Sequence, residues 1–195
     1  MMLFRSAIVL ISAATILACN RGPSSTAGDA AAVAGPSAIP AVAPANPSPH
    51  AEVIVNMLDA CDPDTFNAVI GPGTCVRSGG MTFERFVAQL TRLHFVGAWH
   101  FAAPEANVRV GQTFVASNKG GEVHTFTEVA SFGGGIVPNL NQLAGVPQVA
   151  PECTALEPDD FVAPGGTYRE DVGEAGTLKF QCCIHPWMRL EARSK

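Results

Sequence analysis

The sequence lacks the motifs of several common redox and catalytic classes. No Cys-x-x-Cys-His motif is present, which argues against a covalently attached c-type haem. No Ser/His/Asp arrangement, phosphate-binding glycine loop or paired-carboxylate site stands out either. We therefore expect no catalytic site, and predict that the protein is not an enzyme.

Charge is also scarce, and basic charge in particular. Charged residues make up 15% of the 195 residues, and the formal net charge is −5. A mildly acidic chain disfavours nucleic acid as a partner. The same negative charge is compatible with docking to a basic protein. It is equally compatible with a role in solubility alone.

The apolar stretch near the N-terminus is too short to span a membrane. It covers residues 7–17 after the single basic Arg5, whereas a spanning helix needs roughly 20 apolar residues. Residues 1–18 are typical of an export signal. The sequence Ile-Leu-Ala-Cys that ends at Cys19 resembles a bacterial lipobox, so we predict a periplasmic lipoprotein held to the membrane only by lipid on Cys19. An ordinary secretory signal that happens to contain a cysteine is the alternative.

The rest of the chain divides into a tether and one domain. Residues 19–50 consist mainly of Ala, Pro, Gly and Ser, which predicts a disordered tether. Residues 51–195 have a length suited to one domain, with a helical part over about 51–95. Pro63 and Thr82 mark the starts of two helices, as a first-turn proline and as an N-cap.

From residue 95 onward the apolar residues recur with period two. Such short, β-branched segments between Gly, Pro and Asn turns are typical of an antiparallel β-sandwich. We expect strands over residues 95–101, 107–115, 122–129, 167–172 and 177–182. Residues 131–164 show little periodicity and are predicted to form a long inserted loop between strands.

A short segment near the C-terminus combines three side chains that bind soft metals. Cys182, His185 and Met188 supply a thiolate, an imidazole and a thioether, the set that suits copper cycling between Cu(I) and Cu(II). Such a centre needs a second imidazole, and His124 is the strongest candidate. Zinc is a weaker match, because a structural zinc site normally takes four Cys or His ligands and has no use for Met.

Strand alternation separates the two adjacent cysteines in this segment. Cys182 shares a face with Leu178 and Phe180, so we predict that it points into the apolar interior as the metal ligand. Cys183 then points the other way. If Cys19 carries lipid, four cysteines remain to pair in an oxidising compartment, and we expect the disulfides to be Cys61–Cys75 and Cys153–Cys183.

The motif Cys-x-x-His-Pro-Trp-Met over residues 182–188 resembles the ligand loop of the cupredoxins, the type 1 blue copper proteins, and especially of plastocyanin-like and amicyanin-like members. The resemblance covers roughly residues 99–195. It implies a mainly β fold, a Greek-key β-sandwich, that holds one type 1 copper ion through His124, Cys182, His185 and Met188. The chain departs from the family in its long insertion, its N-terminal helical part and Cys183.

The resemblance also implies a role for neighbouring residues. Thr125 is placed to hydrogen-bond near the thiolate, and Pro186 restricts the ligand loop. The exposed edge of His185, with Pro186 and Trp187, would form the patch through which electrons pass. Trp187 is equally compatible with a place in the core.

We therefore expect an exported carrier of single electrons between periplasmic redox proteins, such as a cytochrome, a dehydrogenase or an oxidase. A copper-binding module for storage, delivery or sensing would share every ligand, and it stays open as the alternative.

Overall fold

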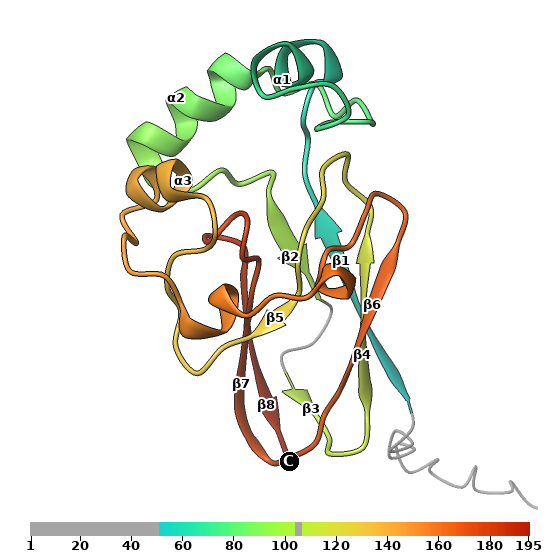
Figure 1. The fold of residues 1–195 in the computed structure, drawn as a ribbon. Coiled ribbons are helices and arrows are strands. Elements are labelled where there is room, and N and C mark those ends of the chain that lie inside the picture. The colour runs from blue at the N-terminus through green and yellow to red at the C-terminus, as the bar shows by residue number, and fades with distance from the viewer. Residues whose placement is uncertain (1–50, 104–106) are drawn as a thin grey trace, which may run out of the picture. The chain divides into compact units, whose positions relative to one another are not determined.

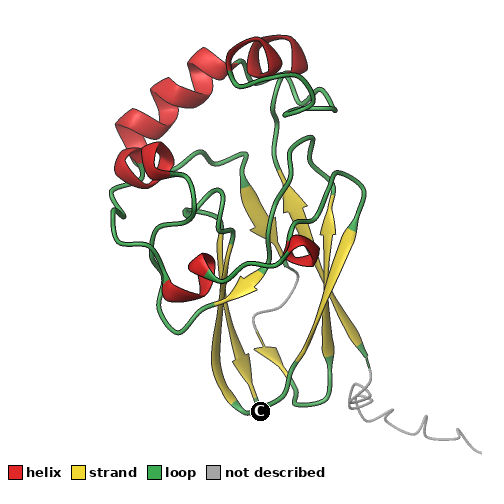
Figure 2. Ribbon diagram, viewed as in Figure 1, coloured by secondary structure: helices red, strands yellow, loops and turns green. Residues whose placement is uncertain are grey.

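The computed structural model describes residues 51–103 and 107–195, which form two four-stranded sheets with helices at one end (Figures 1 and 2). The predicted signal over residues 1–18, the lipid site at Cys19 and the tether over residues 19–50 lie outside the described residues. Within the part of the chain that is described, no helix is long and apolar enough to cross a membrane.

The first sheet has the strand order β2-β1-β4-β6. Its central pair, β1 and β4, runs parallel, and the outer strands pair antiparallel to it. The bounds are β1 Glu52–Leu58, β2 His100–Ala102, β4 Thr113–Asn118 and β6 Thr167–Asp171.

The second sheet has the order β3-β8-β7-β5, with β3 parallel to β8. Its bounds are β3 Asn107–Val108, β5 Thr127–Glu128, β7 Gly176–Gln181 and β8 Arg189–Ser194. Phe114 of β4 meets Phe180 of β7 with ring centroids 5.1 Å apart, and Phe126 stacks on Phe180 at 4.4 Å. The two sheets thus pack face to face around an aromatic core, which confirms the predicted mainly β sandwich.

Several strand bounds differ from the sequence prediction. The part expected to be helical, residues 51–95, begins with strand β1, which pairs with β2 along one edge and with β4 along the other. The segment expected over 107–115 is divided by a turn at Gly111, whose φ of 87° favours glycine. The segments expected over 95–101 and 122–129 are mostly loop, and β8 was not predicted.

Helices α1, α2 and α3 lie at one end of the sandwich (Figure 1). Helix α1 spans Pro63–Val69, and α2 spans Phe83–Leu93 after Thr82, whose hydroxyl accepts a hydrogen bond from the Arg85 N–H. The insertion predicted as a loop contains helix α3, Pro138–Leu143, and two short 3-10 helices, Pro151–Thr154 and Pro158–Asp160.

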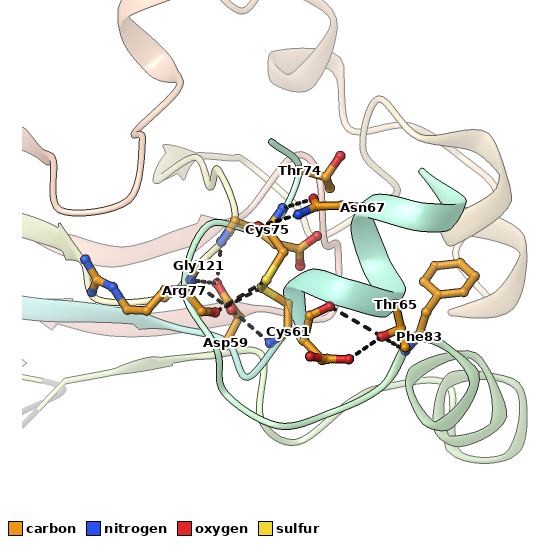
Figure 3. Close-up of a disulfide and its surroundings, with 12 residues drawn as sticks. Asp59, Cys61, Thr65, Asn67, Thr74, Cys75, Arg77, Phe83 and Gly121 are labelled. Carbon is orange, nitrogen blue, oxygen red and sulfur yellow. Dashed lines mark hydrogen bonds between the residues drawn. A yellow bond between two sulfur atoms is a disulfide. The ribbon is translucent and has the colours of Figure 1, made fainter. Parts of the chain in front are cut away.

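Two disulfides fasten the additions to the sandwich, and they are the two pairs expected. Cys61–Cys75 closes the segment that contains α1, and the Asn67 amide hydrogen-bonds the backbone of Cys75 in both directions (Figure 3). Cys153–Cys183 ties the insertion to the residue directly after Cys182. The second disulfide therefore anchors the insertion next to a predicted ligand.

Candidate metal centre

The structure brings three of the four predicted ligands together in the interior. Cys182 Sγ lies 3.9 Å from His124 Nδ1 and 3.8 Å from His185 Nδ1, and the three atoms all lie within 4.8 Å of one another. Each of these three residues is at most 3% exposed. Among the described cysteines, Cys182 is the free one.

The loop between β7 and β8 positions Cys182, His185 and Met188. Cys182 N–H donates to the Met188 carbonyl at 3.0 Å, and Met188 N–H donates to the His185 carbonyl at 2.9 Å. These bonds close the loop on itself, and they place Met188, which is fully buried, in the same turn as the other two residues.

The insertion positions His124. His124 and Val162 form an isolated antiparallel bridge in which each backbone N–H donates to the other's carbonyl, at 3.2 and 2.8 Å. Val162 is near the end of the inserted segment, so this segment holds the imidazole that comes from outside the C-terminal loop.

A carboxylate that sequence reasoning missed orients His124. Nε2 of His124 lies 2.9 Å from Oδ2 of Asp59, whose side chain is 1% exposed. The carboxylate also accepts hydrogen bonds from the backbone N–H groups of Gly121 and Glu122. When a metal ion takes the place of the proton on Nδ1, the proton on Nε2 stays with Asp59 and the Nδ1 lone pair faces Cys182, the arrangement by which carboxylates fix metal-binding histidines. Nothing in the local sequence sets Asp59 apart from the other acidic residues.

The same contacts shift the protonation of this pair. Burial alone would raise the pKa of Asp59, but the hydrogen bonds from His124, Glu122 and Gly121 outweigh it and lower this pKa to about 2. Burial would lower the pKa of His124, whereas its bonds to Asp59 and Cys182 raise it to about 9. In the metal-free protein the pair is therefore a buried ion pair at neutral pH.

Two glycines allow the Asp59 carboxylate to approach the backbone. A Cβ at Gly120 would overlap Oδ2 of Asp59, and a Cβ at Gly121 would lie 2.6 Å from the Arg77 carbonyl and 2.7 Å from Cys61 Sγ. Figure 3 shows Asp59 next to both Gly121 and Cys61, whose backbone N–H groups donate to its carboxylate. The Gly-Gly sequence before His124 is thus required by this close packing.

A second carboxylate lies next to the other imidazole. Glu122 Oε2 accepts a hydrogen bond from the indole N–H of Trp99 at 2.7 Å and lies 3.6 Å from Nε2 of His185. Burial raises the pKa of Glu122, and His185 and Trp99 only partly oppose this. In both histidines Nε2 therefore faces a carboxylate, Asp59 for His124 and Glu122 for His185. The His185–Glu122 distance is longer than a hydrogen bond.

The sulfur of Cys182 receives backbone donors from two sides. The N–H groups of Thr125 and His185 point to Sγ at 3.4 and 3.5 Å. Burial would raise the pKa of the Cys182 thiol, but hydrogen bonds with His124 and His185 hold it well below its usual value. The thiolate, which is the form that binds metals, is thereby favoured. The Thr125 hydroxyl also accepts a hydrogen bond from Cys183 N–H at 2.8 Å, which joins the two ligand-bearing segments.

The edge of the His185 ring, which was expected to be exposed to solvent, is buried. His185 is 3% exposed and Pro186 is buried, while Trp187 is half-buried. The added helical segment explains this, because Phe86 of α2 packs against Trp99 and Trp187, with ring centroids 4.8 and 5.9 Å apart. These two indoles contact the His185 ring, so the prediction of a solvent-exposed imidazole edge was wrong.

The donor set and its spacing fit a single copper ion. At bond lengths of about 2.0–2.3 Å and an angle of about 120°, two ligand atoms lie roughly 3.8 Å apart, which matches both sulfur–nitrogen separations. The candidate donors are one thiolate, two imidazoles and the thioether of Met188, which lies in the same loop as Cys182 and His185. This set suits copper better than zinc. A second cluster, formed by Asp59, Cys61 and Glu122, offers no thiolate because Cys61 is in a disulfide.

Comparison with known proteins finds similarity in solved structures only. No protein-family model matches the sequence, and no curated protein matches it. The structure is similar to a purple cupredoxin from Nitrosopumilus maritimus, with 17% identity and a TM-score of 0.37 over 51% of this chain and 86% of that one. It is also similar to a Cu(I) methionine-to-alanine mutant of amicyanin, with 21% identity and a TM-score of 0.34, and to an oxidised proline-to-glycine mutant of amicyanin, with 22% identity and a TM-score of 0.34. Each amicyanin match covers 49% of this chain and 73% of the other. Likenesses of this size assign neither a metal nor an activity to this chain.

Proposed function

We propose that this protein is a type 1 copper protein that carries single electrons between exported redox proteins. The observation that supports it most strongly is the buried group of Cys182 Sγ with the Nδ1 atoms of His124 and His185. Met188, also buried, lies in the same loop as Cys182 and His185. A bound copper ion would supply a one-electron couple at this place.

The protein's part in this function is to hold the donors still. Asp59 fixes the ring of His124, and two backbone N–H groups fix the sulfur of Cys182. The Cys153–Cys183 disulfide and the hydrogen bond from Cys183 to Thr125 fasten the surrounding backbone. Donors that are held in this way move little when the charge at the centre changes by one, which favours fast electron transfer.

Burial favours a carrier over the alternative of a copper delivery or storage module. A protein that hands over a metal ion needs a ligand that an incoming donor can reach. Here His124, Cys182 and Met188 are 0% exposed and His185 is 3% exposed. An electron can cross the packed aromatic side chains around the site, whereas an ion cannot leave without opening the loop.

The location and the partners are part of the proposal. The signal over residues 1–18 and the lipid on Cys19 would place the domain in the periplasm, on a tether long enough to meet several partners. Redox proteins such as a cytochrome, a dehydrogenase or an oxidase are the partners that a one-electron centre requires.

Copper loading of the mature chain tests the function. With Cys19→Ser to keep the protein in solution, one equivalent of Cu(II) should give an intense visible band from thiolate-to-copper charge transfer. The band should bleach on one-electron reduction and return on oxidation. Binding of Cu(I) alone would favour delivery instead, and a colourless protein that binds no copper would contradict both functions.

A further inference from the structure

The inserted segment, residues 131–164, packs on the outer face of the second sheet beside the candidate thiolate. Between them lies a small apolar cluster, separate from the main core, made of Val129, Ala150, Cys153 and Cys183 with Phe132 and Leu156 packed against it. Side chains alternate along a strand, so Cys182 belongs to the main core while its sequence neighbours, Gln181 and Cys183, point toward the insertion. The insertion therefore contacts the residues on both sides of a predicted metal ligand.

The first attachment is the side chain of Gln181, which is 0% exposed. Its Oε1 accepts a hydrogen bond from the Gly133 N–H at 3.0 Å, and its Nε2 donates to the Gly134 carbonyl at 3.3 Å. Nε2 also lies 3.3 Å from Cys153 Sγ. A buried amide is costly unless its polar atoms are paired, and the insertion supplies each of these partners.

The second attachment is at Cys183. Its sulfur is in the disulfide with Cys153, and its carbonyl accepts a hydrogen bond from the Ile136 N–H at 2.7 Å. The two backbones lie so close here that a Cβ at Gly135 would overlap the Cys183 carbonyl. Glycine at position 135 is therefore what allows the insertion to lie directly against the residue that follows Cys182.

The far end of the same segment is attached to a second predicted ligand. Val162 forms the backbone bridge with His124. The Val162 carbonyl also accepts a hydrogen bond at 2.8 Å from the side chain of Asn118, which is 0% exposed and donates to the Glu122 carbonyl as well. The insertion thus joins the ligand-bearing end of β7 to the ligand-bearing segment between β4 and β5.

We propose that the insertion is a positioning element of the metal centre, and that Gln181 is the positioning residue through which it fixes Cys182. This inference rests on the proposed function, because electron transfer is fast only when the donors move little. The loop over residues 182–188 fixes the sulfur from inside the sandwich, and the insertion fixes the same strand end from outside. Without the bonds of Gln181, the end of β7 and the sulfur of Cys182 move more freely.

Alkylation of Cys182 in the metal-free protein tests this attachment without copper. Cys182 is the free cysteine among the described residues and is buried, so in the Cys19→Ser background iodoacetamide reaches it only when the structure opens locally. The test variant is Gln181→Met, which keeps the length of the side chain and removes its hydrogen bonds.

Gln112→Met is the matched control. Gln112 is also buried, at 6% exposed, and its Oε1 accepts a hydrogen bond from the Arg109 N–H. It lies in the turn between β3 and β4, at the opposite end of the sandwich from α2 (Figure 1). The control therefore applies the same substitution to a buried glutamine that has no contact with the insertion in the described structure.

We expect Gln181→Met to speed alkylation by about tenfold, and urea unfolding to show that both variants are folded. A tenfold change corresponds to about 1.4 kcal/mol of local stability, within the range for a few hydrogen bonds. Gln112→Met should change the rate by less than about twofold, because distant sites act independently. Equal rates for the two variants, or no change for Gln181→Met, would overturn the attachment.

Electron self-exchange in the copper-loaded proteins tests whether this attachment serves the metal centre. Exchange between the reduced and oxidised forms of one variant has no driving force, so its rate, measured by NMR line broadening, reports how far the donors rearrange. We expect Gln181→Met to slow it by about tenfold, the lower end of what loss of outer contacts costs, and Gln112→Met to leave it unchanged. An unchanged rate in Gln181→Met would overturn the positioning role. Failure of the unmodified protein to bind copper would instead overturn the proposed function, and alkylation would still test the attachment.

Hydrogen exchange decides the matter if Gln181→Met does not fold. In the unmodified metal-free protein, the amide protons of Gly133 and Ile136 are the backbone donors at the two attachments. They should exchange as slowly as the amide protons of the paired strands β7 and β8. Exchange of both at the rate of exposed loops would overturn the proposal.

Discussion

Asp59 and His124 form a buried hydrogen bond of 2.9 Å across 65 positions of sequence. Asp59 follows β1, and His124 lies between β4 and β5, so the bond joins the first sheet to the candidate metal centre. Since Gly121 and Glu122 also donate to this carboxylate, its position is fixed from three directions. The negative charge of Asp59 therefore lies next to one predicted ligand and faces the outer nitrogen of its ring.

Asp59→Asn should raise the reduction potential. The substitution keeps the size of the side chain and an oxygen acceptor, but it removes a negative charge that favours Cu(II) over Cu(I). Loss of such a carboxylate partner typically costs about tenfold to 100-fold in metal affinity. If Cu(II) is weakened about tenfold more than Cu(I), the potential rises by about 59 mV, which cyclic voltammetry can measure.

Glu122→Gln is the matched comparison for this variant. Glu122 lies 3.6 Å from Nε2 of His185, whereas Asp59 lies 2.9 Å from Nε2 of His124, so the Glu122 carboxylate acts on its imidazole from a greater distance. We expect a smaller rise in potential than for Asp59→Asn. A larger rise would show that the Glu122 carboxylate, rather than Asp59, supplies the dominant charge.

The stability of the metal-free protein should depend on pH through Asp59. Its pKa is lowered from 3.8 to about 2 on folding, so its contribution is fully present above the unfolded pKa and is lost as the pH falls through the folded one. A shift of this size corresponds to roughly 2 kcal/mol. Urea unfolding of the metal-free protein and of Asp59→Asn should differ most between about pH 5 and 6.5, converge toward pH 2, and draw closer again as the pH rises toward 9 and His124 loses its proton. A constant difference would mean that Asp59 does not titrate as the hydrogen bonds imply.

The sequence predicted the elements with strong local signals and missed those that depend on tertiary packing. Pro63 and Thr82 start helices as expected, because first-turn and capping preferences act locally. The burial of His185 could not be predicted, since it depends on α2 folding over the ligand loop. The role of Asp59 was equally hidden, because the hydrogen bond exists only once β1 lies beside β4.

The two adjacent cysteines should respond differently to substitution. Cys182→Ser should abolish the visible colour, because it removes the thiolate that lies 3.9 and 3.8 Å from the two imidazoles. The double variant Cys153→Ala/Cys183→Ala should keep the colour and lose about 2–5 kcal/mol of stability, as for other native disulfides. Absorption spectra and urea unfolding separate the two effects. A colour that survives the first variant and disappears in the second would reverse the choice of thiolate.

Met188→Leu tests the predicted thioether ligand. Met188 is 0% exposed, and leucine has a similar volume, so the fold should lose less than about 1.5 kcal/mol. If the sulfur is a weak axial donor, its removal disfavours Cu(II), and the potential should rise by about 59 mV for each tenfold loss in relative affinity. The colour should persist, because the thiolate remains. An unchanged potential would exclude Met188 as a ligand.

Gly120→Ala should destabilise the protein through Asp59. The added Cβ would overlap Oδ2 of Asp59, and that carboxylate cannot move away without losing its bonds to His124 and the loop. Overpacking of this kind costs about 1–3 kcal/mol. Gly173→Ala is the control, because a Cβ there meets nothing within 4 Å and the backbone is not in the left-handed region. We expect urea unfolding to show a clear loss of stability for Gly120→Ala and little change for Gly173→Ala. Equal stabilities would mean that the loop before His124 is loose enough to yield, and that Asp59 does not hold this imidazole rigidly.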